Sequence, residues 1–523
     1  MNDPMPSIPL ERFVLTAEDQ RAADQAAVAR GVPEIELMES AGRSASDWIL
    51  DHLAPSRVAV LGGPGGNGGD GLVVSRLLAE AGIEVRTFLL QEAEQMSRAA
   101  GVMLERLHDV GERESLVEDG AFDEVESALA WGDWVVDALF GSGVTRPLAG
   151  RYRDVVERLN AARARVVSLD LPSGLASDQG EIFGDVVRAT VTLAMAFLKP
   201  AHLFFPASGL CGNVAVVSVA YPPDILSSIR PRARVAEQAG VGRRLPGRRQ
   251  DGHKGTFGRV LVVAGSVGMA GAAILCCRAA LRAGAGLVTL AAPASINAVL
   301  AKALPEATTV SLPDEEGHLA GIGDPRFSQA LARADVVAIG PGLSRAPATG
   351  AAVRELVSRF GGPILLDADG IAAFKDSVVE LRSANAPVLL TPHPGEFGEL
   401  VGRSPDEVDA DRLDAAGSFA REFGLTLLLK GRPTAIGLPD GTVYLNPTGN
   451  TGLATGGSGD ALTGLIAGFV AGGATLEDAA ILGAYVHGWT AEVYARDQAE
   501  RSLTPSDLID LLPTVLREVE SWS

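Results

Sequence analysis

Two glycine-rich segments, each beside an apolar stretch, contain the residues of this sequence that are best suited to chemistry. The segment GNTGLATGGSGDALTGLIAG at 449–468 places Gly459 and Asp460 at the start of an expected apolar helix. Backbone N–H groups at a helix start bind anions, and Asp460 beside them can take a proton from a hydroxyl. The pair suits phosphoryl transfer to an alcohol, although an Asp at that position can also simply cap the helix. The sequence has no G-x-x-x-x-G-K-[ST] pattern, which excludes the P-loop class.

The other glycine-rich segment, GGPGGNGGDG at 62–71, joins an expected strand at 57–63 to an expected helix over 71–81. From Gly63 onward it fits G-x-G-x-x-G, the pattern of dinucleotide-binding loops. Its glycines allow a phosphate to approach the backbone, but the carboxylate of Asp70 would repel a pyrophosphate. Asp70 can instead cap the helix.

Two further loops follow expected strands in the first half of the chain, VDALFGSGVTRP at 136–147 and SLDLPSGLASDQG at 168–180. In an open parallel sheet, loops at the carboxyl ends of strands line one crevice. We therefore expect oxygen-bearing side chains to converge there, with Asp170 free to act as an acid or base, namely Asn67, Asp137, Asp170 and Ser173. The plainer alternative is that both aspartates only cap their loops.

Three segments of the second half add to a nucleotide site around Asp460. TPHPGEFGEL places His393 and Glu396 at a strand-to-helix turn, and LLLKGRPTAI ends a strand on Lys430, whose charge can bind a phosphate. HKGTFGRVLVVAGSVGMAGAAIL offers a strand and then a loop of small residues that a ligand can approach closely. A single His or Lys is usually structural, so the placement of these residues at successive strand ends is what favours a site.

The elements that position these residues form two series of apolar strands separated by helical stretches. The first series is expected at 57–63, 83–90, 133–140, 164–172, 189–197 and 213–220, and the second at 259–266, 334–342, 363–370, 386–396 and 425–431. Between them, residues 221–255 are rich in proline and charge. The pattern predicts two α/β domains, with mostly parallel sheets covered by helices on both faces and a boundary between about 225 and 250.

Composition narrows the class of protein and of partner. The 523 residues are 47% hydrophobic and 21% charged with 61 glycines, which is typical of globular α/β domains. A net charge of −20 argues against nucleic acid or an anionic membrane as a partner. The longest apolar tract, 271–292, carries Arg278 and Arg282, and the first residues lack a signal-peptide pattern. We expect a cytoplasmic protein, and the apolar Gly/Ala-rich helices favour a homo-oligomer.

The motifs GGNGGDG, DALFGSGVTRPLAG and LDLPSG together resemble the NAD(P)HX epimerase domain, also called the YjeF N-terminal domain, over roughly residues 10–220. The resemblance implies a Rossmann-like three-layer domain that interconverts R- and S-NAD(P)HX, the hydrated forms of NAD(P)H. It implies a potassium ion bound by Asn67, Asp137 and Ser173. It also implies substrate contacts at Gly66, Asn67, Gly68, Gly69, Asp70, Gly141, Ser142, Gly143, Val144, Thr145, Arg146, Pro147 and the catalytic Asp170. Lys199 matches the family although its flanking residues do not.

The second half is similar to the ADP- or ATP-dependent NAD(P)HX dehydratases of the ribokinase-like superfamily over about 235–520, through HKGTFGRVLVVAGS, IGPGL, TPHPGEF, LKGRPT and NTGLATGGSGDALTG. The resemblance implies that a nucleotide phosphorylates the hydroxyl of S-NAD(P)HX and that phosphate is then eliminated. It implies substrate contacts at Ala272, Gly342, His393 and Asp460, with Asp460 as the base. Nucleotide contacts fall on Lys430, Gly431, Arg432, Pro433, Thr434 and Gly459. Two departures are Thr451, where proline is usual, and DADGI at 367–371.

We therefore expect an epimerase domain at residues 1–225 and a dehydratase domain at 226–523, joined in one enzyme that repairs NADHX and NADPHX. Fused proteins of this family favour ADP as the phosphoryl donor, with ATP as the alternative, and the chemistry calls for Mg²⁺. A ribokinase-like kinase for a vitamin or sugar, with a non-catalytic nucleotide-binding first domain, is the main competing hypothesis. A plain dehydrogenase is the weakest, because Asp70 lies in the glycine loop.

Overall fold

The protein, seen here in a computed structural model, is described over residues 11–120, 122–178 and 180–522. The chain divides into two units. One runs from Phe13 to Arg232, and the other begins at Ala233 and also includes Glu11 and Arg12. We call them the N-terminal and C-terminal units and describe each by itself.

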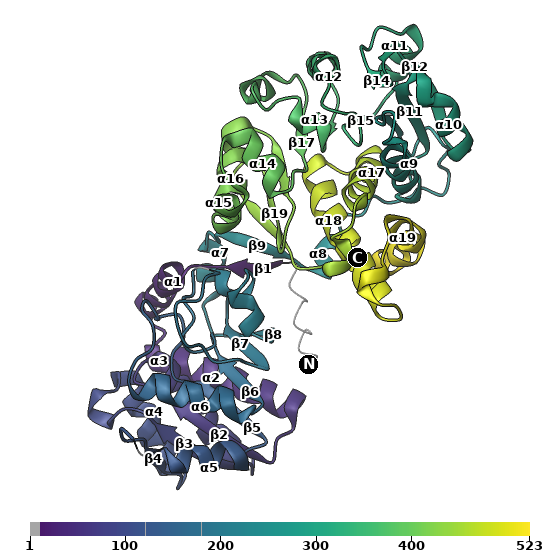
Figure 1. The fold of residues 1–523 in the computed structure, drawn as a ribbon. Coiled ribbons are helices and arrows are strands. Elements are labelled where there is room, and N and C mark those ends of the chain that lie inside the picture. The colour runs from purple at the N-terminus through teal and green to yellow at the C-terminus, as the bar shows by residue number, and fades with distance from the viewer. Residues whose placement is uncertain (1–10, 121, 179, 523) are drawn as a thin grey trace. The chain divides into compact units, whose positions relative to one another are not determined.

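The N-terminal unit is built on a parallel sheet with the strand order β4-β3-β2-β5-β6-β7-β8 (Figure 1). Its strands are β2 (Arg57–Gly62), β3 (Glu84–Leu89), β4 (Glu114–Leu116), β5 (Trp134–Ala138), β6 (Val166–Leu169), β7 (Val191–Met195) and β8 (Asn213–Val217). The chain proceeds from β2 to β4 in one direction and from β5 to β8 in the other. The strand order therefore reverses between β2 and β5, and ligands of open α/β sheets bind at such a point.

Helices cover both faces of this sheet, and alternate residues of its strands enter two separate cores. Val58 and Val60 pack in the core that includes residues of α2 and α3, whereas Ala59 and Leu61 pack in the core that includes residues of α5 and α6. The helices are α1 (Ala17–Ala29), α2 (Glu34–Leu53), α3 (Gly66–Glu80), α4 (Arg98–Asp109), α5 (Asp123–Trp131), α6 (Arg151–Ala162) and α7 (Pro223–Ser228). The expected three-layer arrangement is confirmed.

Strand β1 (Glu11–Val14) is divided between the two units. The C-terminal unit has a longer sheet, in the order β9-β20-β19-β18-β17-β16-β15-β10-β11-β12, in which β19 is antiparallel to both neighbours. Its strands are β9 (Ala233–Ala236), β10 (Arg259–Val263), β11 (Leu287–Pro293), β12 (Thr308–Leu312), β15 (Val336–Ile339), β16 (Ile364–Leu366), β17 (Val388–Leu390), β18 (Thr426–Leu429), β19 (Thr434–Gly437) and β20 (Val443–Asn446), with a separate hairpin of β13 (Asp314–Glu315) and β14 (His318–Leu319). Here the order reverses between β10 and β15, which are parallel.

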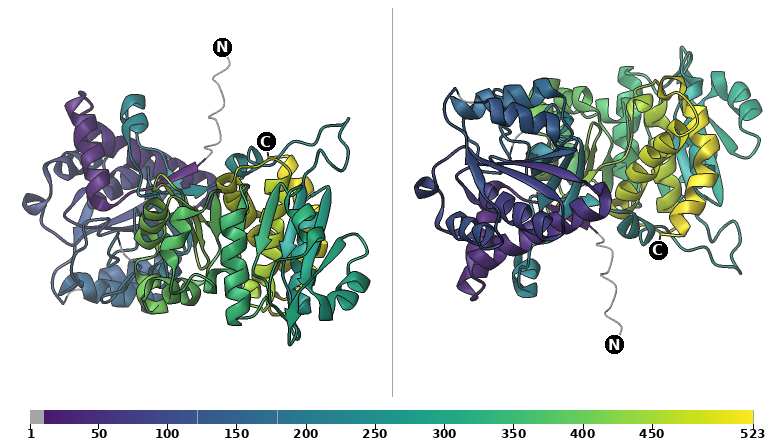
Figure 2. Two further views of the ribbon diagram at one scale, coloured as in Figure 1. Left: turned by 90° about the horizontal axis from the view of Figure 1, so that it is seen from above. Right: turned by 90° about the horizontal axis from the view of Figure 1, so that it is seen from below.

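Four helices of the C-terminal unit, α9, α17, α18 and α19, pack side by side over one core, and the last three are the yellow helices of Figure 2. The helices of this unit are α8 (Gln238–Gly242), α9 (Ala270–Arg282), α10 (Asn297–Ala303), α11 (Pro325–Leu331), α12 (Pro347–Arg359), α13 (Asp369–Ala372), α14 (Pro394–Val401), α15 (Pro405–Ala410), α16 (Arg412–Phe423), α17 (Ser458–Ala471), α18 (Leu476–Ala495) and α19 (Pro505–Glu520). α17 is buried along most of its length, so small residues such as Gly464 are needed where it touches α9.

The structure confirms the expected α/β class, with two units that are each built on a parallel or mostly parallel sheet. It corrects one expectation, because α3 begins at Gly66 rather than Gly71, so Asp70 lies inside the helix and cannot cap it. The apolar tract 271–292 contains two elements, α9 and β11, separated by a turn. No helix in the described ranges is long and apolar enough to span a membrane.

Candidate functional site

In the N-terminal unit the loops after β2 and β5 come together where the strand order reverses. A Cβ on Gly63 would lie 1.8 Å from the carbonyl oxygen of Leu139, so only glycine permits this approach. Asn67, in the first turn of α3, lies beside the loop after β5. A Cβ on Gly141 of that loop would lie 3.4 Å from Cγ of Asn67 and 3.0 Å from Oδ2 of Asp170. The structure therefore brings Asn67, Gly141 and Asp170 together, as the motifs predict.

Asp170 is held by a buried lysine that the motifs left without a role. The ammonium group of Lys199, which is fully buried, donates to Oδ1 of Asp170 and to the carbonyl oxygen of Phe197 at 3.1 Å. The backbone N–H of Ser142 donates to Oδ2 at 3.1 Å. Asp170 itself has a φ of +63°, a conformation that Asp and Asn tolerate better than other non-glycine residues. Both carboxylate oxygens are thus fixed before any ligand binds.

These contacts set the charge of the group. Burial alone would raise the pKa of Asp170, but the Lys199 ammonium outweighs it and holds that pKa below its ordinary value. His202 locks the turn: its Nδ1 accepts from the Lys199 backbone N–H at 3.0 Å, so Nε2 carries the proton and donates to the carbonyl oxygen of Asp170 at 2.7 Å. Burial lowers the pKa of His202 to about 4, so its ring is neutral.

Asp137 and Ser173 form a second buried group beside the same loop. The Asp137 carboxylate accepts from Ser173 Oγ at 2.6 Å, Ser173 N at 2.9 Å, Ser168 Oγ at 2.7 Å and Leu139 N at 3.3 Å. Burial raises its pKa in spite of these donors. The side-chain Oδ1 and Nδ2 of Asn67 are buried without a partner among the described residues. Asn67 lies beside Gly141, and Ser173 Oγ accepts from the N–H of Phe140, the preceding residue, at 2.8 Å. The unused amide oxygen of Asn67 fits a monovalent cation such as K⁺, whose hydration shell neutral oxygens can replace.

The remaining residues expected to contact substrate in this unit lie on the exposed loop after β5. Gly143, Thr145, Arg146 and Pro147 are exposed and Val144 is partly buried. Only Ser142 is tied directly to Asp170.

In the C-terminal unit, the loops after β10 and β15 meet in the same way. Gly265 N donates to the Pro341 carbonyl oxygen at 2.9 Å, and Ser266 Oγ donates to that of Gly342 at 2.8 Å. Gly342 has a φ of +63°, and a Cβ on it would lie 3.0 Å from that of Ala272 on α9. Ala272 and Gly342, both expected to contact substrate, are thus neighbours.

Asp460 lies in the first turn of α17, and the start of a helix is a favourable place for an anion. The helix begins at Ser458 with Gly457 as the N-cap, so Asp460 is its third residue and the capping alternative is wrong. A Cβ on Gly459 would lie 3.2 Å from Nζ of Lys430, which places this cation at the helix start. Burial, together with the negative charge of Asp367, raises the pKa of Asp460 to about 7. A carboxyl with that pKa is suited to general-base work near neutrality.

Asp367, which sequence reasoning noted only as part of an unusual motif, is the centre of this site. It is 1% exposed, and its carboxylate accepts from Thr391 Oγ1 at 2.8 Å, Thr463 Oγ1 at 2.9 Å and Lys430 Nζ at 3.1 Å. Burial alone would raise its pKa, but the Lys430 charge and these donors hold that pKa below the usual value. The signal was available, because Asp367 follows an apolar strand as Asp137 and Asp170 do.

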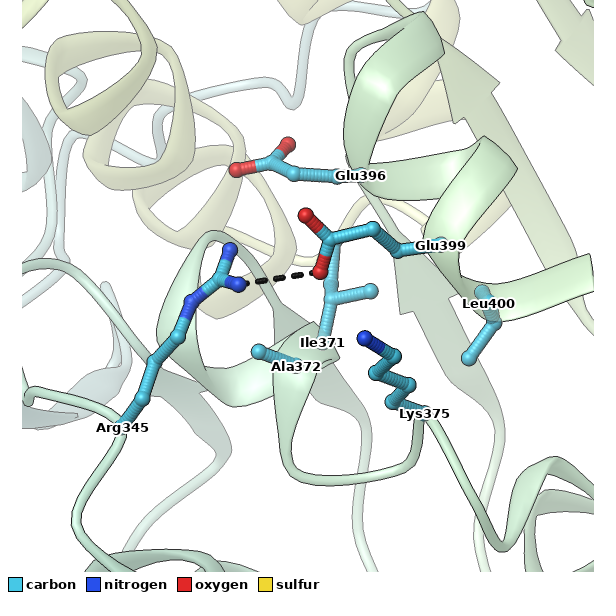
Figure 3. Close-up of a pocket in the computed structure, with 7 residues that line it drawn as sticks. All are labelled: Arg345, Ile371, Ala372, Lys375, Glu396, Glu399 and Leu400. Carbon is cyan, nitrogen blue, oxygen red and sulfur yellow. Dashed lines mark hydrogen bonds and ion pairs between the residues drawn. The ribbon is translucent and has the colours of Figure 1, made fainter. Parts of the chain in front are cut away.

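His393 caps α14 with its ring, since Nδ1 accepts from Gly395 N at 3.0 Å and Glu396 N at 3.2 Å. In return Glu396 accepts from the His393 backbone N–H at 2.9 Å and lies 3.8 Å from Nζ of Lys430. Figure 3 shows Glu396 above Glu399 on α14, with Arg345 reaching Glu399 at 2.9 Å. Beside it, a pocket of about 500 Å³ is lined by the cations Arg345, Arg354 and Lys375 and by acidic residues.

The turn after Lys430, where nucleotide contacts were expected, is held by hydrogen bonds to its backbone carbonyl oxygens. The Arg412 guanidinium donates to the carbonyl oxygens of Lys430 at 3.0 Å and Pro433 at 3.2 Å, and Thr434 Oγ1 donates to that of Gly431 at 3.0 Å. Gly431 and Arg432 are exposed, which leaves this turn open to a ligand.

Comparisons with known proteins agree with this two-site arrangement. Residues 34–201 match the family model described as YjeF-related protein N-terminus, and residues 260–514 match the one described as NAD(P)H-hydrate dehydratase. A solved structure of ADP/ATP-dependent NAD(P)H-hydrate dehydratase from Bacillus subtilis, co-crystallised with ATP/Mg²⁺, is 33% identical, and the match covers 54% of this chain and 98% of that one with a TM-score of 0.48.

Relatives of the full length are also found. The bifunctional NAD(P)H-hydrate repair enzyme of Thermofilum pendens is 37% identical over 495 residues, 94% of each chain. That of Moorella thermoacetica is 40% identical over 515 residues, 97% of each chain. Similarity of this extent, with both family models matched in order, means that the chain belongs to the bifunctional NAD(P)H-hydrate repair enzymes.

Proposed function

We propose that this protein repairs hydrated nicotinamide cofactors: the N-terminal unit interconverts R- and S-NAD(P)HX, and the C-terminal unit dehydrates S-NAD(P)HX to NAD(P)H at the expense of ADP, with ATP as the alternative donor. The observation that carries the proposal is Asp460, a carboxyl of raised pKa in the first turn of α17 beside Lys430. This arrangement supports the proposal, because a base, a helix start and a cation would then act together on one phosphoryl group.

In dehydration, the carboxylate of Asp460 takes the proton of the C6 hydroxyl as the hydroxyl oxygen attacks the terminal phosphoryl group of the nucleotide. The bond from that phosphorus to the bridging oxygen breaks, and AMP leaves when ADP is the donor, or ADP when ATP is the donor. The N–H groups of α17 and the Lys430 ammonium bind the phosphates, and the loop of Lys430, Gly431, Arg432, Pro433 and Thr434 with Gly459 holds the nucleotide. The C6–O bond then breaks as C5 loses a proton, which releases phosphate and restores the dihydropyridine ring. Mg²⁺, arriving with the nucleotide, would neutralise charge on the phosphates.

In epimerisation, the ionised Asp170 is the group placed to exchange a proton with the C6 hydroxyl, and the loops 66–70 and 141–147 bind the rest of the substrate. Asn67, Asp137 and Ser173 would hold K⁺, which adds a fixed positive charge near an anionic substrate. We assign residues 1–225 to the epimerase and 226–523 to the dehydratase. We further propose a cytoplasmic homo-oligomer, which light scattering on the purified chain would test.

The experiment is absorbance at 340 nm while the purified chain, Mg²⁺ and ADP act on a mixture of R- and S-NADHX. Conversion of the whole mixture to NADH is the expected result, because epimerisation feeds the R form to the dehydratase. Conversion of only the S fraction would overturn the epimerase assignment. Recovery with ATP but not ADP would correct the donor, and none with either would favour a small-molecule kinase.

A further inference from the structure

The pocket of about 500 Å³ in the C-terminal unit has no role in the function proposed above. Its walls come from the loop after β15, from α12, and from α13 with the residues that follow it. None of the residues that line it was expected to contact substrate or nucleotide, although Gly342 lies only two residues before Ser344 of this wall. A pocket of this size holds a small molecule or one part of a larger ligand.

Two cations of this pocket, Arg345 and Lys375, also lie close to the residues of the catalytic site. Figure 3 shows both side chains with Glu396 of α14 around a second, smaller cavity, so the two cavities share these cations. The Glu396 carboxylate lies 3.5 Å from Nε2 of His393 and 3.8 Å from Nζ of Lys430. The pocket is therefore next to residues that were expected to contact substrate and nucleotide.

The cations of the pocket differ in how firmly they are held. The guanidinium of Arg345, whose side chain is 55% exposed, lies 2.9 Å from Glu399 and 3.7 Å from Asp369. Arg354 donates to a backbone carbonyl oxygen at 2.7 Å. Lys375 is exposed, and its ammonium has no partner among the residues that the structure describes. Since an exposed ion pair adds little stability, an anionic ligand can replace Glu399 on Arg345 and bind Lys375 as well.

The pocket offers oxygen acceptors and hydroxyls together with these cations. Asp376 and Glu380 provide carboxylates, and Ser344 and Ser377 provide hydroxyls. In nucleotide sites a carboxylate accepts from ribose hydroxyls, whereas an arginine binds a phosphate on the 2′ oxygen of the ribose. The combination of both groups in one pocket suits a ribose that carries a phosphate. That group is what distinguishes NADPHX from NADHX, since NADHX has a free 2′ hydroxyl on the same ribose.

We propose that this pocket binds the 2′-phosphorylated adenosine ribose of NADPHX, with Arg345 and Lys375 on the phosphate, and that the dehydratase therefore prefers S-NADPHX to S-NADHX. The proposal rests on the dehydratase activity proposed above. The hydrated ring reacts at Asp460, and a ribose and a pyrophosphate separate it from the adenosine ribose. The adenosine end therefore needs a surface beyond the catalytic residues, and the pocket is such a surface, because Glu396 borders both its cations and Lys430.

The test compares initial rates of dehydration of purified S-NADPHX and S-NADHX by the full chain with ADP and Mg²⁺, followed at 340 nm. For the wild type, kcat/KM should be at least about tenfold higher with S-NADPHX, mainly through a lower KM, because the phosphate is remote from the reacting atoms. Added NaCl should raise the KM for S-NADPHX more than that for S-NADHX, since salt screens exposed cations.

Two variants test the cations directly. Arg345→Gln and Lys375→Gln should each lower the ratio of kcat/KM for S-NADPHX to kcat/KM for S-NADHX by about three- to tenfold, because each removes a charged partner of the phosphate. Lys302→Gln, at an exposed lysine of α10, is the matched control and should leave the ratio unchanged. Both cations are exposed, and the rate with S-NADHX shows that each variant is folded.

The possible failures are distinguishable. Equal kcat/KM for the two substrates in the wild type would overturn the phosphate pocket. A ratio that stays at the wild-type value in both Arg345→Gln and Lys375→Gln would overturn the assignment of these cations to the phosphate. A wild-type chain that dehydrates neither substrate would overturn the proposed dehydratase itself.

Discussion

The buried pair of Lys199 and Asp170 makes a sharp prediction about stability. Lys199→Met keeps the apolar stem but removes an ammonium that is fully buried, and it leaves the 6%-exposed Asp170 carboxylate without its cationic partner. Breaking a buried ion pair from one side costs about 3–5 kcal/mol, because an uncompensated charge remains. Domains are stable by only about 5–15 kcal/mol, so the loss is a large fraction of the total.

The loss depends on pH, and its sign follows from the pKa of Asp170. In the wild type that pKa is depressed, so the carboxylate adds stability above its unfolded pKa, which is lost as pH falls through the folded value. In Lys199→Met the ammonium no longer offsets burial, so the folded pKa rises and the carboxylate becomes destabilising above the unfolded pKa. The difference between the proteins is therefore largest near pH 7.5 and shrinks toward pH 4.

Urea unfolding of the full chain at pH 7.5 and 4.5 measures this difference. Lys302→Met, at an exposed lysine of α10, is the matched control and should change stability by less than about 0.5 kcal/mol. The double variant Lys199→Met/Asp170→Asn removes both charges and should recover most of the loss, since Asn also tolerates the φ of +63°. A loss below about 1 kcal/mol at pH 7.5, or no recovery in the double variant, would refute the ion-pair reasoning.

Three further predictions concern the proposed activities. Asp460→Asn should lower dehydration at least about 100-fold and leave epimerisation unchanged, as followed by absorbance at 340 nm and by chromatography. Burial raises the pKa of Asp460 to about 7, and the base must be ionised to act. The kcat of dehydration should therefore fall about tenfold per pH unit below pH 6 and level off above pH 8. A kcat that stays constant from pH 5.5 to 8 would contradict the role of Asp460 as the base. Replacing K⁺ by a bulky organic cation should slow epimerisation by the wild type, and Asn67→Ala should remove this dependence on the cation. An Asn67→Ala protein whose epimerisation rate still responds to K⁺ as the wild type does would show that Asn67 is no ligand.

The strands that lead into the two sites were predictable from sequence because each is a short apolar run that ends at a glycine or an aspartate. β2, β5, β6, β10 and β15 all lie inside their expected ranges. β11 was missed, because a short apolar run cannot be told from a buried helical segment by its periodicity alone. β19 and β20 were missed although the PDG sequence between them is a hairpin signal.

The chemistry of the site was less accessible than the strands. Spacing places Asp170 and Asp460 at strand or helix ends, but it says nothing of the partners that set their charge. Lys199 reaches Asp170 from 29 residues away, and Lys430 reaches Asp367 from 63 residues away. Asp24 and Tyr221, 197 residues apart, meet only because α1 and the segment after β8 close the same pocket.

The two units use one electrostatic rule on two different sheets. In each, a buried aspartate at a strand end is kept ionised by a lysine, Asp170 by Lys199 and Asp367 by Lys430. That fixed negative charge, added to burial, raises the pKa of a second aspartate in the helix that follows a glycine loop, Asp70 or Asp460. A carboxyl in water does not hold a proton at neutral pH, whereas burial, with a fixed negative charge beside it, favours the protonated form. The lysine in each unit therefore has two effects. It keeps the first carboxylate ionised inside the protein, and the charge of that carboxylate helps to raise the pKa of the second aspartate.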